Sequence, residues 1–245
     1  MIENLNIAVT GMLAQQERIT AVSQDLTNVD TTGYKQTRQG FRDLVYNELG
    51  RAQAGNVNGG SGVAMDPAGR SFEQGAVQRT DQPLDVALQG EGFIQVRLPD
   101  GRAALTRDGS LRVDARGQLQ TASGALVQPP ITIPVGTALD DVSIGADGTV
   151  EAGGKRLGRL SIVTVRAPQA LQDAGSNAFV TTPSSGAATR APAATAVSKG
   201  ALEMSNVDAS EEMVEMIDAQ RSFQLASKAI TTADEMWQIA NGIRR

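Results

Sequence analysis

The 245-residue sequence contains no cysteine and no histidine. Their absence excludes disulfides, thiol nucleophiles, Cys/His zinc sites and catalysis that depends on a histidine base. Aromatic residues make up only 3% of the chain, whereas glycine occurs 26 times. This composition favours packing of small side chains and many tight turns. We therefore expect a protein without a metal or a cofactor that is not an enzyme.

Long apolar runs and clusters of basic residues are also absent. The longest apolar runs, such as residues 160–165, are far shorter than the roughly 20 residues that span a bilayer. The net charge is −5, and the scattered Lys and Arg residues give no sign of a nucleic-acid partner. No basic residue precedes Arg18, so the N-terminus does not resemble a cleavable signal peptide. If the protein is exported, we expect another route.

What the sequence does contain is a heptad pattern near its N-terminus. Apolar residues recur every seven positions, and a second series follows each of them by three: Leu5, Met12, Ile19 and Leu26, then Ala8, Gln15, Val22 and Val29. These are the a and d positions of a coiled-coil seam, with Gln15 as its polar member. A helix from Leu5 to Val29 would be roughly 36 Å long. Gly33 is placed to end it in a left-handed conformation.

A second heptad pattern lies near the C-terminus and predicts another long helix. The a positions hold Ala209, Met216, Phe223, Ile230 and Trp237, most of which are large. The d positions hold the alanines Ala219, Ala226, Ala233 and Ala240. Asp208 or Asn206 can cap its start, because a side-chain oxygen there accepts a free helical N–H. Acidic residues in the first turn (Glu211, Glu212) and basic residues at the far end (Arg244, Arg245) complement the helix dipole.

Both predicted helices also carry apolar residues outside the seam. These are Ile2, Val9 and Leu13 in the first helix and Met213, Val214, Ile217, Met236, Ile239 and Ile243 in the second. One interpretation is a helical hairpin that only closes on itself. The other is a hairpin that also packs against copies of itself, because apolar surface on several stripes requires burial on several sides. We favour the second interpretation.

Between the helices the apolar period changes to two, which predicts short β-strands. Glycine-containing turns separate these strands at Gly90–Gly92, Asp100-Gly101, Asp108-Gly109, Arg116-Gly117, Asp147-Gly148 and Gly153-Gly154. Residues 50–71 and 183–196 are rich in small and turn-forming residues and predict loose connections. The fold class is therefore α+β: a coiled-coil-like pair of terminal helices with an inserted antiparallel β domain.

We divide the chain into four consecutive segments. Residues 1–45 hold the N-terminal helix, 46–75 an extended glycine-rich connector, 76–198 the β domain, and 199–245 the C-terminal helix that pairs with the first.

A search for catalytic motifs yields no convincing site. Residues 59–62 lack the second glycine of a nucleophile elbow, and residues 149–156 lack both the first glycine and the Ser/Thr of a phosphate loop. The turn aspartates do not have EF-hand spacing, which leaves weak calcium binding as a minor alternative. An enzyme could act only through carboxylates, Lys, Tyr34, Tyr46 or an oxygen-bound metal.

Two terminal motifs resemble those of bacterial flagellar rod and hook proteins. The first, NVDTTGYKQTRQGFRDLVY, matches at Asn28, Thr32, Gly33, Tyr34, Lys35, Phe41, Asp43 and Leu44. Asp25 and Thr27 depart from the residues that are usual in that family. The second motif matches at Ser205, Asn206, Val207, Met216, Ile217, Gln220, Arg221, Phe223, Lys228, Thr232, Asp234 and Met236. The β region, including PLDVALQGEGFIQVRLPDG, is also similar.

The resemblance implies a structural subunit of the flagellar rod, most like those of its distal part. Such a subunit leaves the cell through the flagellar type III channel without a cleaved leader. It then polymerises through its terminal helices into a hollow shaft that transmits torque, in the basal body across the periplasm or cell wall. The implied partners are copies of itself, other rod and hook proteins, and surrounding ring proteins, with no small-molecule substrate.

Three alternatives stay open. The chain could be a proximal-rod subunit, a hook subunit, or a secreted β-rich binding module on a helical stalk.

Overall fold

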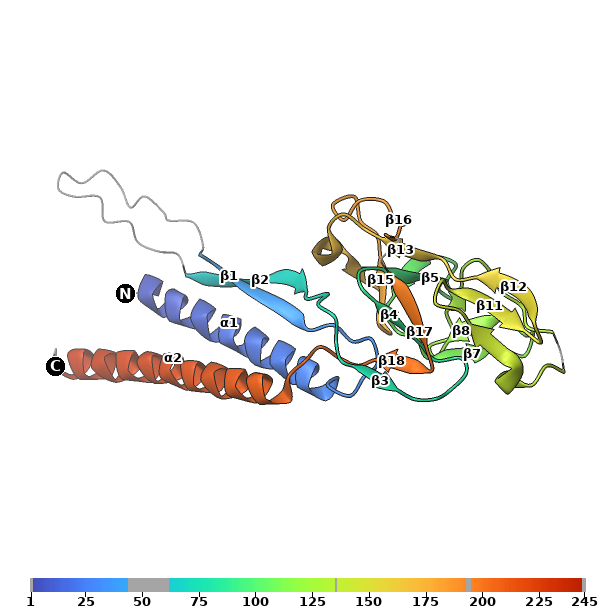
Figure 1. Cartoon of the computed structure of the whole chain (residues 1–245). Coiled ribbons are helices and arrows are strands. Elements are labelled where there is room, and N and C mark those ends of the chain that lie inside the picture. The colour runs from blue at the N-terminus through green and yellow to red at the C-terminus, as the bar shows by residue number, and fades with distance from the viewer. Residues whose placement is uncertain (1, 44–61, 135, 193–194, 244–245) are drawn as a thin grey trace. The chain divides into compact units, whose positions relative to one another are not determined.

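A computed structural model describes residues 2–43, 62–134, 136–192 and 195–243 (Figure 1). The chain forms two compact units, each discontinuous in sequence. The helical unit comprises residues 1–27, 37–68 and 208–245, and the β unit comprises residues 28–36 and 69–207. These units group residues that contact one another, whereas the four predicted segments are consecutive stretches of sequence. The segment boundaries therefore stay a prediction.

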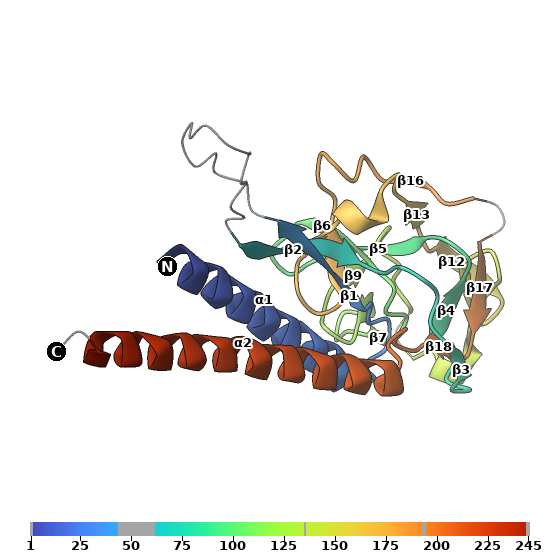
Figure 2. The same cartoon turned by 90° about the vertical axis from the view of Figure 1, so that its left-hand side faces the viewer.

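The helical unit contains the two long terminal helices. Helix α1 (Ile2–Thr27) and helix α2 (Ala209–Ile243) contact each other and run in opposite directions (Figures 1 and 2). Strands β1 (Thr37–Asp43) and β2 (Val63–Arg70) form a two-stranded sheet, and β1 contacts α1. The prediction that residues 50–71 form a loose connection is therefore wrong for the part that forms β2. Residues 50–61 lie outside the described residues.

Helix α1 ends earlier than the heptad pattern predicts. Its last residue is Thr27, so Val29 lies beyond the helix. The hydroxyl groups of Ser23 and Thr27 donate to carbonyl groups one turn earlier, and a turn follows in which the Thr31 N–H donates to the Asn28 carbonyl. Gly33 has the expected positive φ of 67°, but it lies past that turn and does not end the helix.

Asp208 caps the start of α2, as the sequence predicts. Its Oδ1 accepts hydrogen bonds from the backbone N–H groups of Ser210 (2.7 Å) and Glu211 (3.3 Å), which lack helical partners. These bonds favour the ionised carboxylate and lower the pKa of Asp208 below its usual value. Asn206, the other candidate, makes its hydrogen bonds within the β unit. Arg244 and Arg245 lie outside the described residues.

Replacing Asp208 with alanine should loosen the first turn of α2, whereas Asp208→Asn should retain most of the cap. Because the folded-state pKa is lowered, the advantage of aspartate over alanine is present near neutral pH. It is lost as the pH falls through the folded-state pKa. Amide hydrogen exchange in the first turn of α2 measures the effect. Equal exchange in the aspartate and alanine proteins at neutral pH would contradict the assignment.

The β unit consists of short strands in several sheets. Its strands are β3 (Val77–Arg79), β4 (Val86–Gln89), β5 (Phe93–Arg97), β6 (Ala103–Thr106), β7 (Leu111–Val113), β8 (Leu119–Thr121), β9 (Leu126–Val127), β10 (Val142–Ile144), β11 (Thr149–Ala152), β12 (Lys155–Arg159), β13 (Ile162–Thr164), β14 (Gln172–Asp173), β15 (Ala178–Val180), β16 (Thr189–Arg190), β17 (Ala196–Lys199) and β18 (Ala201–Glu203). Short 3-10 turns lie at η1 (Leu139–Asp141) and η2 (Pro168–Ala170).

The described pairings of these strands are antiparallel, as the sequence predicts. The largest sheet has nine strands along the path β14-β15-β6-β5-β9-β8-β7, with β13 and β16 joined to it through β5. A three-stranded sheet β10-β11-β12 and the pairs β17-β4 and β18-β3 complete the unit. The larger of two apolar core clusters includes Leu88, Ile94, Leu119, Ile131, Val142 and Val150. The smaller cluster consists of Phe93, Leu105, Val163 and Val165.

Most predicted turns join adjacent strands. Asp100-Gly101 connects β5 to β6, Arg116-Gly117 connects β7 to β8, and Asp147-Gly148 connects β10 to β11. Asp108-Gly109 separates β6 from β7, as predicted, but it is not a hairpin turn, because these two strands do not pair with each other. Both residues are buried, and the Gly109 carbonyl accepts a hydrogen bond from the Val86 N–H.

Gly109→Ala should destabilise the β unit severely. A Cβ atom at this position would lie 1.6 Å from the Val86 carbonyl oxygen, so the backbone of β4 would have to move. Gly101→Ala is the control, because its Cβ would meet nothing within 4 Å. It should cost only about 1–2 kcal/mol for its left-handed conformation. Denaturant unfolding measures both, and similar losses would contradict the predicted close packing at Gly109.

Candidate functional site

The faces of α1 and α2 that carry the heptad positions are only partly shielded from solvent. Val22 and Ala219 are buried. The half-buried seam residues are Ala8, Met12, Ile19, Leu26, Met216, Phe223, Ala226, Ile230 and Ala233. Trp237 is exposed, and the side chain of Leu5 lies outside the described residues. An ion pair between Arg18 and Glu215 (3.2 Å) joins the helices, but its partial exposure limits its worth to less than about 1 kcal/mol.

Both helices also carry large apolar side chains that are exposed in the single chain. We call this set of residues the outer apolar surface. It consists of Val9, Leu13, Met213, Val214, Ile217, Leu225, Met236 and Ile239. All of these except Leu225 are residues that the sequence places outside the seam, whereas the side chains of Ile2 and Ile243 lie outside the described residues. Leu225 is the most exposed of these residues, at 69%.

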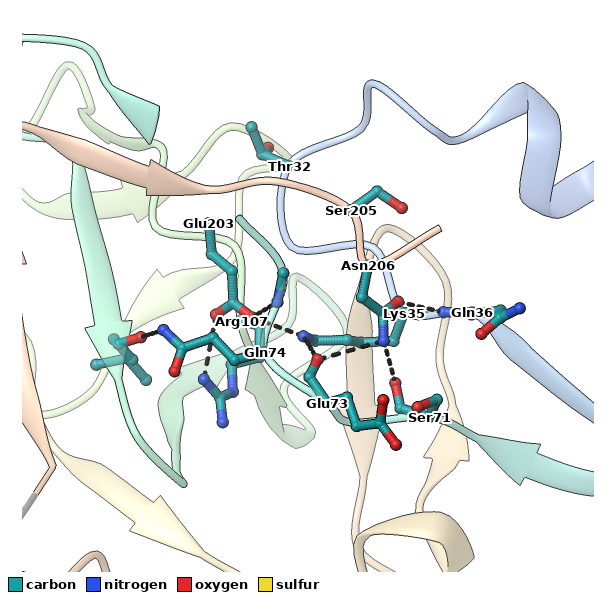
Figure 3. A network of polar contacts seen from close by, with 12 residues as sticks. Thr32, Lys35, Gln36, Ser71, Glu73, Gln74, Arg107, Glu203, Ser205 and Asn206 are labelled. Atoms are coloured by element: carbon teal, nitrogen blue, oxygen red, sulfur yellow. Dashed lines mark hydrogen bonds and ion pairs between the residues drawn. The ribbon is translucent and has the colours of Figure 1, made fainter. Parts of the chain in front are cut away.

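Residues 28–36 of the N-terminal motif fold into the β unit, where Lys35 joins a buried cluster of charges (Figure 3). The Lys35 Nζ atom donates to Glu203 Oε1 and to the Glu73 carbonyl oxygen, both at 2.6 Å. Glu203 Oε2 accepts from Arg107 at 3.1 Å. Oε1 also accepts from the Gly75 backbone at 3.1 Å. The side chains of Lys35 and Glu203 are fully buried, and that of Arg107 is 3% exposed.

Two cations thus share one buried carboxylate. Burial lowers the pKa of Lys35 below its usual value, and the opposite charge of Glu203 offsets part of this shift. A lysine with a lowered folded-state pKa binds its proton more weakly than in the unfolded chain. The contribution of Lys35 to the free energy of unfolding therefore becomes more favourable as the pH rises from the folded-state pKa toward 10.5. Near neutral pH, removal of the Glu203 carboxylate would take from both cations the negative charge that they directly contact.

Backbone contacts tie residues 28–36 to the C-terminal end of the β unit. The Gly33 N–H donates to the Glu203 carbonyl at 2.8 Å, and the Gln36 N–H donates to Asn206 Oδ1 at 2.8 Å. Asn206 Nδ2 in turn donates to the carbonyl groups of Ser71 (3.0 Å) and Glu73 (3.2 Å). Residues from both ends of the chain and from its middle therefore meet at this cluster (Figure 3).

Tyr34 and Thr32 are held by further specific contacts. The Arg70 guanidinium lies 5.1 Å from the centre of the buried Tyr34 ring and donates to the Lys35 carbonyl at 2.7 Å. Arg70 also pairs with Asp173. The Thr32 hydroxyl donates to Asp108 Oδ1 at 3.2 Å.

The other motif residues lie in different environments. Asn28 accepts a hydrogen bond from the Thr31 hydroxyl, Ser205 and Val207 are buried, and Phe41 is exposed on β1, 5.9 Å from the Arg18 guanidinium. The remaining members lie on the exposed part of α2: Gln220, Arg221 and Lys228. The structure therefore brings the N-terminal motif residues 32–35 together with Asn206 in the β unit, whereas these α2 residues belong to the helical unit.

Asp25, which departs from the usual family residue, is buried in the helical unit. Both of its carboxylate oxygens lie near the Thr37 backbone N–H, at 3.1 and 3.2 Å. It thereby anchors the first residue of β1 to the end of α1. An aspartate serves as acceptor for this donor without difficulty, so the departure does not disturb the local fold.

Reasoning from the sequence missed four residues of the cluster: Glu203, Arg107, Asp108 and Arg70. Asp108 belongs to an Asp-Gly pair, which the sequence indicates only as a turn between strands, and nothing in the sequence pattern singles out Arg107. Glu203 lies in a short strand between apolar neighbours, and such alternation usually places a charged residue on the solvent face. Only the pairing of β18 with β3 and the arrival of residues 28–36 show that this face is covered.

Among residues 2–43, 62–134, 136–192 and 195–243, no group of His, Cys, Asp and Glu could hold a metal ion. In the same residues, no helix is long and apolar enough to cross a membrane. The features that distinguish this chain are thus an uncovered helical surface and a polar cluster built from its terminal motifs.

Comparisons with known proteins define the class. Residues 87–152 match the flagellar hook protein FlgE/F/G D1 domain, and residues 198–243 match the C-terminal domain of the flagellar basal body rod FlgEFG proteins. Both the β unit and the C-terminal helix thus match domains of flagellar hook and rod proteins.

Full-length relatives define the family more closely. The chain is 37% identical to the flagellar basal-body rod protein FlgG of Borreliella burgdorferi, over 100% of both chains. It is 36% identical to FlgG of Caulobacter vibrioides over 98% of each, and 35% identical to FlgG of Bacillus subtilis over 100% of each. The chain belongs to the family of flagellar basal-body rod proteins and is most like the distal-rod members named FlgG.

Proposed function

We propose that this chain is a structural subunit of the distal flagellar rod that polymerises through its two terminal helices. The observation that carries the proposal is the outer apolar surface, which the single chain leaves exposed on both α1 and α2. Burying apolar surface stabilises an assembly by about 25 cal/mol per Å² before the costs of association. Copies of the helix pair offer complementary apolar faces, and their packing would form the wall of a hollow shaft.

The heptad seam has a separate role in this proposal. It joins α1 to α2 as a coiled-coil-like pair, so that each subunit presents a stiff two-helix element to its neighbours. Export through the flagellar type III channel, a position across the periplasm or cell wall, and contacts with hook and ring proteins are further parts of the proposal. They rest on membership of the family.

Electron microscopy and sedimentation of the concentrated protein test this function. We expect tubular or filamentous assemblies, and we expect that removal of about ten residues from either terminus abolishes them. The β unit should still fold in both truncated proteins. A full-length protein that stays monomeric at high concentration, alone and with other axial proteins, would contradict the proposal and favour a binding module.

A further inference from the structure

Residues 28–36 occupy the β unit in the manner of a bound peptide. Neither end of this segment continues into the β unit, because residues 1–27 before it and 37–68 after it belong to the helical unit. Its contacts are nevertheless numerous and directed. They come from β18, from the chain after it, from residues 70–75 and from the buried segment at Arg107 and Asp108.

Each position of the sequence Thr-Gly-Tyr-Lys-Gln meets a different requirement of the site. Thr32 donates to Asp108, and its carbonyl accepts from Asn177 Nδ2 at 2.9 Å. Gly33 allows no side chain, since a Cβ atom would lie 2.6 Å from the Asp108 backbone nitrogen and its φ is 67°.

The next three residues are also recognised individually. Tyr34 is buried beside the Arg70 guanidinium. The Lys35 ammonium group meets Glu203, and the Gln36 backbone forms hydrogen bonds with Asn206 and Ser71. The site therefore selects this peptide sequence by steric exclusion, by charge and by backbone hydrogen bonds together. A segment that only filled space in the core would not need all three.

We infer that the β unit contains a peptide-recognition site for this segment. In the single chain the site is filled by the chain's own residues, and the same segment of a second copy can bind there in their place. Recognition depends on contacts and not on the covalent link, so the segment of one copy can replace that of another. The chain's own segment competes at a high effective concentration. Exchange therefore requires that this segment first leave the site.

Full-length Gly33→Ala protein tests the inference, because the added Cβ expels the chain's own segment from the site. The probe is a fluorescently labelled synthetic peptide with the sequence of residues 28–36, measured by anisotropy on the monomer. We expect saturable binding to the variant and at least about tenfold weaker binding to the wild-type chain, whose site is filled. A Lys35→Met peptide should bind the variant about tenfold more weakly or worse, since it lacks the charged hydrogen bond to Glu203.

Full-length Lys35→Met protein is tested in parallel, because it retains glycine and leaves Glu203 paired with Arg107. The wild-type peptide should raise its melting temperature, and the Lys35→Met peptide should not. Protease resistance of residues 69–207 confirms that the β unit is folded in each protein. The inference is overturned if neither folded variant responds to the wild-type peptide, or if both peptides act equally. Because these measurements use monomers, they do not depend on whether the chain forms a rod.

Discussion

Glu203→Gln is expected to lower the free energy of unfolding by about 3–5 kcal/mol, the typical cost of breaking a buried ion pair. Glu203 is the one carboxylate that contacts both Lys35 and Arg107, and the side chains of all three are nearly or fully buried. Glutamine retains the volume and one acceptor oxygen but not the charge. Two cations would then be buried near each other without the charge of Glu203. Urea unfolding of the β unit measures the loss.

Two comparisons isolate the electrostatic origin of this loss. Lys35→Met should cost less than Glu203→Gln, because Glu203 retains Arg107 and the Gly75 N–H as partners. The double variant should recover part of the loss, since one uncompensated cation is gone. Glu151→Gln, at an exposed position of β11, is the matched control and should change stability by less than about 0.5 kcal/mol. Strict additivity of the two single changes would contradict direct coupling of Lys35 and Glu203.

Leu225→Glu should abolish assembly while leaving the monomer intact. Leu225 is 69% exposed in the single chain, so the change should alter monomer stability by less than about 0.5 kcal/mol. In the proposed assembly the same position is covered by a neighbouring subunit. Burial of an unpaired carboxylate there would cost several kcal/mol at every subunit contact. Sedimentation should show at least about a hundredfold rise in the concentration needed for assembly, since 1.4 kcal/mol already corresponds to tenfold.

Gln220→Glu provides the control for this prediction. It adds the same charge to the same helix at a position that is also exposed but polar. It should raise the concentration needed for assembly much less than Leu225→Glu does. Ile217→Glu, at a second position of the outer apolar surface, should repeat the effect of Leu225→Glu. If all three variants assemble alike, the outer apolar surface is not the contact between subunits.

The long helices and the strand-rich middle could be predicted from the sequence because their signals are local. Heptad spacing, an Asp at the helix start and Asp-Gly turns each depend on neighbours within a few positions. The end of α1 was predicted too late, since Val29 continues the apolar spacing although the backbone has already turned at Asn28. The spacing of the apolar residues gives no sign of that turn.

The buried cluster could not be predicted because its members are far apart in the sequence. Lys35, Arg107 and Glu203 come from three regions of the sequence. Each is a charged residue of a type that usually lies on the protein surface. The resemblance to the flagellar family drew attention to Lys35, but it did not indicate a partner. Only the insertion of residues 28–36 into the β unit makes a charged lysine an interior residue.

Hydrogen exchange of the same protein as dilute monomer and as concentrated assembly tests the account most directly. We predict that amides of α1 and α2 become markedly more protected on assembly, with the largest gain in peptides that carry Leu13, Ile217 and Leu225. Amides in the core of the β unit, such as those of β5 and β6, should change little. Assembly with unchanged protection of both helices, or with protection gained only in the β unit, would contradict polymerisation through the terminal helices.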